Sequence, residues 1–256
     1  MSTMRLAALW RHPVKSFQGE SLDEAVIEAK GLAGDRVWGL RDEATGKILT
    51  ARRIPPLLLA QARLNGATGP ELTLPDGTTL TGTGPDVDAA LSDWLGKPVR
   101  LVAAAEEPAG VGEFFADATD DTSEAIEWTM PEGRFVDALP LLLLTTATLR
   151  ACERAYPEGE WDVRRFRPNL LIEADGDGYV EDAWLGKTVR VGDVELQPVA
   201  GCERCTMVTR PQPGLERDVD IFRTVLREHG GALGVWTAVR TPGTVRIGDP
   251  VEVDLS

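Results

Sequence analysis

Cys202 and Cys205 form a Cys-x-x-Cys pair, a spacing found both in thioredoxin-like redox motifs and in halves of zinc sites. A zinc site is disfavoured because the sequence has no second cysteine pair and both histidines lie far away. The redox motif would open a helix, whereas the following residues 206–209 favour a strand. Arg204 and Arg210 favour the thiolate, the form of cysteine that binds metals. The pattern therefore leaves two interpretations open, a reactive or metal-binding thiolate and a pair of buried hydrophobic side chains.

Three arginines lie within four positions, at Arg164, Arg165 and Arg167, and Asn169 follows two residues later. Guanidinium groups bind phosphate or carboxylate through two parallel hydrogen bonds, and an asparagine adds a neutral donor and acceptor. Any one of these arginines could simply pair with an acidic side chain, since the chain has 41 Asp+Glu against 27 Lys+Arg. The cluster as a whole predicts an anion site.

A further basic group combines Lys15 and Ser16 with Arg36, which follows a glycine-rich segment at residues 31–34. Glycines permit close backbone approach to a ligand, so these side chains could meet around an anion where two strands end. The pattern is weak by itself, because Lys-Ser is a common dipeptide and Gly-Asp is a turn signal. Arg52 and Arg53 add further positive charge, but the sequence does not show where their side chains point.

Composition excludes several classes of protein. With 43% hydrophobic and 27% charged residues, the chain is typical of a globular protein that can bury a core. A net charge of −14 argues against general nucleic-acid binding, and three cysteines do not make a disulfide framework. The longest apolar run, residues 138–144, is far too short to cross a bilayer, and no export signal is apparent. We therefore expect a cytoplasmic protein without a membrane association.

The elements that must position these residues are mainly β-strands. Residues 1–105 contain short strands between turn signals, a hairpin over residues 71–81 with Asp76-Gly77 at its turn, and a helix over residues 87–95. Residues 106–134 are acidic and weakly periodic, which predicts a linker or long loop. Residues 135–256 contain further strands, among them one over residues 169–173. These predict a mainly β fold with flanking helices (α+β), a β-barrel-like domain followed by a second β-barrel. Two more helices are expected, over residues 146–156 and 218–229.

Taken in order, these segments resemble the MOSC family, in the two-domain form of the amidoxime-reducing components and their bacterial relatives. The resemblance covers nearly the whole chain and depends on the order of its motifs. The motifs are Pro13-Val14-Lys15-Ser16, Gly31-Leu32-Ala33-Gly34-Asp35-Arg36, Leu49-Thr50-Ala51-Arg52, Asp137 with Pro140-Leu141-Leu142-Leu143, Arg165-Phe166-Arg167-Pro168-Asn169, Arg204-Cys205 and Val245-Arg246-Ile247-Gly248-Asp249.

The resemblance implies a molybdenum–molybdopterin cofactor (Mo cofactor) between a MOSC N-terminal β-barrel domain (1–105) and a MOSC domain (135–256). By the same resemblance Cys205 is the catalytic residue and the metal ligand, and a soft thiolate suits molybdenum. The residues that would bind the rest of the cofactor are Lys15, Ser16, Arg36, Arg167, Asn169 and Arg204.

The activity implied is reduction of N-hydroxylated compounds by oxygen-atom transfer to molybdenum, which makes the protein a molybdenum-dependent oxidoreductase. Electrons would come from a separate ferredoxin-, flavin- or cytochrome-type donor protein. Two alternatives stay open: a carrier or sulfur-transfer module for the same cofactor without turnover, and a metal-free thiol protein using Cys202 and Cys205.

Overall fold

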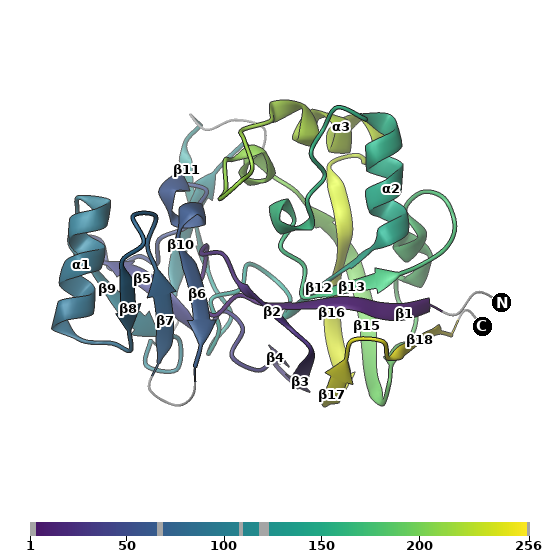
Figure 1. Ribbon diagram of the computed structural model, residues 1–256, viewed down its shortest axis with the longest axis horizontal. Coiled ribbons are helices and arrows are strands. Elements are labelled where there is room, and N and C mark those ends of the chain that lie inside the picture. Colours follow the sequence, from purple (N-terminus) through teal and green to yellow (C-terminus); the bar gives the residue numbers. More distant parts are fainter. Residues whose placement is uncertain (1–3, 66–68, 108–109, 118–122, 255–256) are drawn as a thin grey trace.

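A closed barrel of seven strands dominates the computed structural model, which describes residues 4–65, 69–107, 110–117 and 123–254 (Figure 1). Around the barrel each strand is hydrogen-bonded to the next, and the first strand of the chain pairs with β13 to close the ring. In their order around the barrel the strands are β13 (Leu170–Glu173), β12 (Leu141–Thr145), β16 (Ala232–Thr241), β15 (Val194–Glu203), β14 (Val189–Val191), β18 (Pro250–Val253) and β1 (Met4–Arg11).

The barrel has a continuous apolar interior because its strands alternate inward and outward side chains. Leu6 and Leu9 of β1 are fully buried in this core, together with Leu141 and Leu143 of β12. The next residue of β12, Leu144, packs instead under the helices outside the barrel. Because β12 is covered on both faces, its sequence is an almost unbroken hydrophobic run.

The first strand belongs to the barrel of the second half, although the sequence placed residues 1–105 in one unit. β1 pairs antiparallel with β13 and β18, and Figure 1 shows β1 and β18 side by side in this barrel. A further small sheet joins the halves in the same way. It contains β17 (Gly243–Arg246), β3 (Glu24–Glu28) and β4 (Gly31–Leu32).

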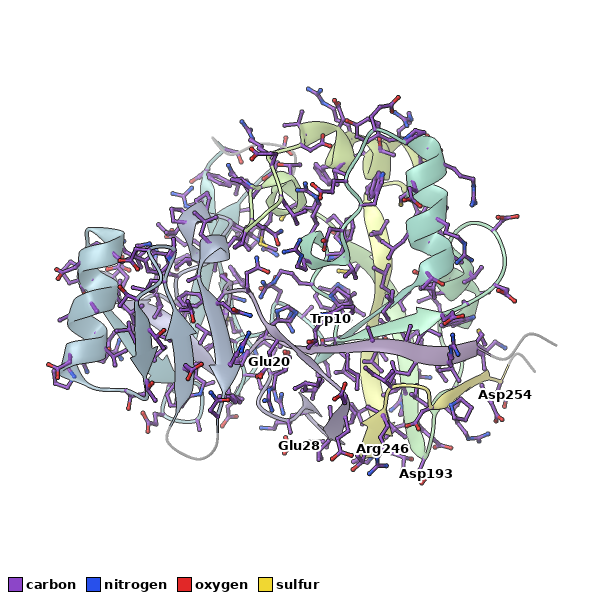
Figure 2. All side chains as sticks on the ribbon, in the orientation of Figure 1. Trp10, Glu20, Glu28, Asp193, Arg246 and Asp254 are labelled. Carbon is purple, nitrogen blue, oxygen red and sulfur yellow. The ribbon has the colours of Figure 1, made fainter. Side chains whose placement is uncertain are left out.

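The chain leaves the barrel through β2 (Glu20–Leu22), which pairs with the end of β1. In Figure 2, Trp10 and Glu20 lie where the chain crosses between the two halves. The Glu20 carboxylate accepts hydrogen bonds from the Arg11 guanidinium at 2.9 Å and from the backbone N–H of Leu64 at 3.0 Å. This side chain therefore ties the barrel to the sheets of the first half.

Small antiparallel sheets and one helix form the rest of the first half. The predicted hairpin turns at Asp76-Gly77, where Gly77 has a φ of 88°. The predicted helix is α1 (Pro85–Leu95), which begins with a proline and ends at Gly96 in the left-handed conformation. The strands are β5 (Trp38–Asp42), β9 (Val99–Ala103), β6 (Gln61–Leu64), β7 (Pro70–Thr73) and β8 (Thr79–Thr81).

A β-hairpin occupies the segment expected to be a linker or long loop. Within residues 106–134, β10 (Val111–Phe115) pairs antiparallel with β11 (Ala125–Thr129), and residues 118–122 lie outside the described part. The acidic composition obscured the aromatic residues that stabilise it, since Phe114 and Trp128 pack edge to face at 5.3 Å.

The other two predicted helices lie against the barrel as α2 (Thr146–Ala155) and α3 (Val219–His229). The Thr145 and Asp218 side chains accept backbone N–H groups and so cap them. The expectation that residues 206–209 form a strand is wrong, because Thr206–Thr209 is a 3₁₀ helix. The segment 47–52 also lies outside the strands and is held by β-bridges from Ile48 to Arg41 and to Gly112. Among the described residues, no helix is long and apolar enough to cross a membrane. The mainly β fold with flanking helices is confirmed.

Candidate functional site

One cavity between the two halves is lined by every residue that the sequence analysis placed in a cofactor site. It has about 800 Å³ of free space when its open mouth is included. The predicted residues that line it are Lys15, Ser16, Arg36, Arg167, Asn169, Arg204 and Cys205. Segments far apart in the sequence thus converge on one place, as the motif order suggested.

A carboxylate bridges two cations in the wall of this cavity. Lys15 Nζ donates to Asp137 Oδ1 at 2.6 Å and to the Phe135 carbonyl at 2.8 Å, and Arg52 Nη2 donates to Asp137 Oδ2 at 2.8 Å. Burial would raise the pKa of Asp137, but the charges of Lys15 and Arg52 hold it far below its usual range. The Arg52 and Asp137 side chains are part of the site, although neither was among the predicted site residues.

The glycine-rich segment before Arg36 is held by Asp35, which is fully buried. Asp35 Oδ1 accepts the backbone N–H of His12 at 2.7 Å, and Oδ2 accepts Arg36 Nη1 at 2.5 Å. At the start of the segment, Gly31 has a φ of 107°, and a Cβ there would lie 2.8 Å from the Pro140 side chain. The Gly34-Asp35 turn that the sequence indicated therefore directs the Arg36 side chain into the cavity.

Arg167 is buried and forms no ion pair within the described part of the chain, although the charges of Asp35 and Asp137 act on it. Its side chain is 6% exposed, Nη1 donates to the Phe17 carbonyl at 2.7 Å, and Nη2 has no hydrogen-bond partner among the described residues. Burial, with the charge of Arg36, lowers the pKa of Arg167 to about 9. An anion bound in the cavity would offset the cost of burying this cation.

The other two arginines of the cluster do not line the cavity. Arg164 pairs with Asp162 at 2.7 Å near the surface. Arg165 is 1% exposed and donates to main-chain carbonyls, among them those of Glu160 and Glu216 at 2.9 Å. Of the three, only the arginine preceding Pro168 contributes to the site.

Cys205 follows the end of β15 and is the N-cap of the 3₁₀ helix Thr206–Thr209. The preceding Arg204 fixes this segment, because its guanidinium donates to the carbonyls of Leu233 and Phe166 at 2.9 Å. Cys205 is half-buried, whereas Cys202 is 2% exposed and burial raises the pKa of its thiol. The more accessible thiol is thus the one that the resemblance selected.

The Arg52 guanidinium also lies near Cys205 in the cavity wall. Burial would lower the pKa of Arg52, but the charge of Asp137 and that of a Cys205 thiolate raise it. Asn169 lines the same cavity with its amide engaged by the chain, since Oδ1 accepts from Leu142 N at 3.2 Å and Nδ2 donates to the Trp10 carbonyl at 3.3 Å. Its role toward a cofactor stays a prediction.

Strained backbone is concentrated at this cavity. Among the described residues, the non-glycine residues with positive φ are Ser16 at 71°, Arg36 at 50° and Arg167 at 54°. Such conformations cost energy and persist where the surrounding structure enforces them, commonly at functional sites. All three line the cavity.

The arrangement combines a thiol with an excess of positive charge. Five cationic side chains and two carboxylates are among the described lining residues, in a chain whose net charge is −14. Within the described residues, no three His, Cys, Asp or Glu side chains are grouped to hold a metal ion. The lining therefore suits an anionic ligand.

Comparison with known proteins identifies relatives over almost the full length. The chain is 29% identical over 287 residues to the mitochondrial amidoxime-reducing component 1 of Mus musculus, covering 96% of this chain and 81% of that protein. It is 25% identical over 279 residues to the molybdenum cofactor sulfurase of Danio rerio, covering 93% of this chain and 32% of that protein. Among solved structures, the YUAD protein of Bacillus subtilis aligns with 98% of this chain and 96% of its own, with 12% identity and a TM-score of 0.49.

Two family models match consecutive parts of the chain. The MOSC N-terminal beta barrel domain matches residues 3–121, and the MOSC domain matches residues 131–252. The cavity with Cys205 lies between side chains from both matched segments. The chain therefore belongs to the MOSC-domain family, as the order of its sequence motifs indicated.

Proposed function

We propose that the cavity between the two halves holds a molybdenum–pterin cofactor, with Cys205 as the protein ligand of the metal. The observation that carries the proposal is a cationic cavity with an accessible thiol, in which the buried Arg167 has no ion-pair partner among the described residues and its Nη2 donates no hydrogen bond to them. The anionic phosphate of such a cofactor fits Arg167, Arg36 and Lys15, and its dithiolene sulfurs would complete the metal coordination.

The activity we propose is reduction of N-hydroxylated compounds, because relatives that cover nearly the whole chain are named amidoxime-reducing components. Reduction breaks the N–O bond, consumes two electrons and two protons, and releases water. The cofactor would supply the two-electron chemistry, and a separate ferredoxin-, flavin- or cytochrome-type protein would supply the electrons. The chain itself positions the cofactor and substrate, with Arg52 near Cys205 and Asp137 fixing Arg52.

Transfer or storage of the same cofactor is the second candidate, because a molybdenum cofactor sulfurase is also a relative. The same cationic side chains would serve a carrier, so cofactor binding does not distinguish the two functions. Turnover does: a carrier binds the cofactor and does not reduce a model amidoxime with any electron donor.

The test is to produce wild type, Cys205→Ser and Cys202→Ser in a host that makes the cofactor. Molybdenum is measured by elemental analysis and pterin by fluorescence after oxidation. We expect about one molybdenum and one pterin per wild-type chain, retained in Cys202→Ser, with molybdenum lost in Cys205→Ser. Cofactor-loaded wild type should reduce benzamidoxime with a chemical electron donor. Absence of molybdenum and pterin from folded wild type would contradict the proposal and favour the thiol pair.

A further inference from the structure

A second cavity opens beside Cys205, on the side of the β10–β11 hairpin. It has about 670 Å³ of free space with its mouth included, and Arg52, Arg204, Phe114 and Phe115 are among the residues that line it. Arg52, Arg204 and Cys205 line the first cavity as well. A molecule in the second cavity would therefore reach the sulfur that we assign to the metal.

Aromatic side chains of the hairpin form one wall of this second cavity, and cations hold them in place. The guanidinium of Arg52 lies 5.5 Å from the Phe114 ring centre and 5.4 Å from that of Trp128. On the other face of β10, the guanidinium of Arg53 lies 4.5 Å from the Phe115 ring centre. Contacts of this kind are attractive and orient the rings. The wall is thus a built surface rather than a loose loop.

The chemistry of this wall favours a flat, uncharged group. Asp137 contacts Arg52 at 2.8 Å but is shared with Lys15. The described lining of the second cavity itself holds two cations, Arg52 and Arg204, and two carboxylates, Asp117 and Glu203, so its charges are balanced. Phe114 is half-buried and offers an aromatic surface beside Arg52. Glu203, which is exposed and lines both cavities, can accept N–H groups of a ligand. A planar conjugated molecule carrying an N–OH group matches these features.

We propose that the second cavity is the substrate subsite and that Phe114 makes it selective for N-hydroxylated compounds attached to an aryl group. This inference depends on the proposed function for its choice of ligand. The aromatic side chains of the hairpin would contact the aryl group. An aliphatic compound with the same N-hydroxylated group lacks that contact and would bind less tightly. Phe114 contributes to binding of the aryl group and takes no part in breaking the N–O bond.

The test compares benzamidoxime with acetamidoxime, which share the amidoxime group and differ in the aryl ring. Their binding to cofactor-loaded, unreduced protein is measured by calorimetry, and KM and kcat are measured with a chemical electron donor. The variants are Phe114→Leu, which keeps apolar volume but loses the flat ring, and Ile126→Ala as a matched control. Ile126 pairs with Phe114 across the hairpin, is 42% exposed, and lies outside the described lining of the second cavity.

In Phe114→Leu, Kd and KM for benzamidoxime should rise about 3- to 10-fold, the range that an aromatic contact contributes, with kcat unchanged. Values for acetamidoxime should change less than about twofold, and Ile126→Ala should change neither compound. Equal effects on both compounds, or no effect, would overturn the subsite. Selective binding of benzamidoxime without any reduction would support the subsite and contradict the reductase, so the two failures are distinguishable.

Discussion

Replacing Arg167 by methionine should stabilise the cofactor-free protein and weaken its hold on the cofactor. Burial and the charge of Arg36 lower the pKa of Arg167 to about 9. At about 1.4 kcal/mol per pH unit, the charged form costs about 4–5 kcal/mol relative to a solvated arginine. The variant loses one charge-assisted hydrogen bond to the Phe17 carbonyl, about 2 kcal/mol. The net expectation is a gain of about 2 kcal/mol, which raises Tm by about 5 °C.

The gain should be the same throughout the neutral range. Because the folded chain holds the Arg167 proton less tightly than the unfolded chain does, the cost is fully present below about pH 9 and falls at higher pH. With the cofactor bound, the loss of the ion pair to an anionic group should weaken binding by about 30-fold or more. The assay is thermal unfolding of cofactor-free and cofactor-loaded protein, followed by circular dichroism, together with pterin content after purification.

Arg165→Met is the matched control, since Arg165 is also buried but donates to several main-chain carbonyls, whereas Arg167 donates only to that of Phe17 among the described residues. Removing those donors leaves buried carbonyl oxygens unpaired, which should cost about 3 kcal/mol or more and lower Tm by more than about 5 °C. A fall in Tm of cofactor-free Arg167→Met similar to that of Arg165→Met would refute the reasoning. It would show that Arg167 stabilises the fold of the cofactor-free protein, and that its charge does not need a bound anion.

Further predictions concern reactivity, pH dependence and backbone conformation. In the native cofactor-free protein, iodoacetamide should modify Cys205 alone, because Cys152 and Cys202 are buried. Burial raises the pKa of both buried thiols, that of Cys152 to about 12. Mass spectrometry of the peptides locates the label. Glu181→Gln should stabilise the protein by about 1–2 kcal/mol near pH 8 and by less near pH 4 in urea unfolding. Burial raises the pKa of the Glu181 carboxyl, and its Oε1 accepts no hydrogen bond from the residues that the structure describes, so ionisation becomes costly as the pH rises. Gly31→Ala should cost about 2 kcal/mol or more in the same assay, because φ is 107° and a Cβ would lie 2.8 Å from a proline side chain; an unchanged midpoint would contradict the observed turn.

Local features of the fold could be predicted from the sequence because neighbouring residues alone decide them. The hairpin turn at Asp76-Gly77 needs residues that accept positive φ, and α3 is bounded by an aspartate cap and a glycine stop. The residues of the cavity were also predictable, since the order of the motifs placed Lys15, Arg167 and Cys205 in one site. What they do there stays a prediction that the experiments above test.

Pairings between distant strands were decided by the tertiary structure alone. β1 closes a barrel with β13 and β18, and the residues between 106 and 134 form a hairpin whose aromatic side chains meet basic residues of the first half. Every residue type except proline offers the same backbone hydrogen-bonding groups, so these bonds do not select a partner strand. The partner is selected by how the side chains on the faces of the sheet pack together.

The direction of individual side chains needed the structure as well. Arg165 and Arg167 are two residues apart and both basic, yet Arg165 packs outside the cavity and donates to several main-chain carbonyls, whereas Arg167 lines the cavity. The left-handed backbone of Arg167 directs its guanidinium to the Phe17 carbonyl in the other half, and Nη2 has no hydrogen-bond partner within the described part of the chain. The order of residues along the chain shows which residue types are available for the site and which local turns present them. The burial of these side chains and their excess of positive charge make the cavity suitable for an anion. Both depend on segments from the two halves that exclude water from the cavity, and this exclusion exists only in the folded chain.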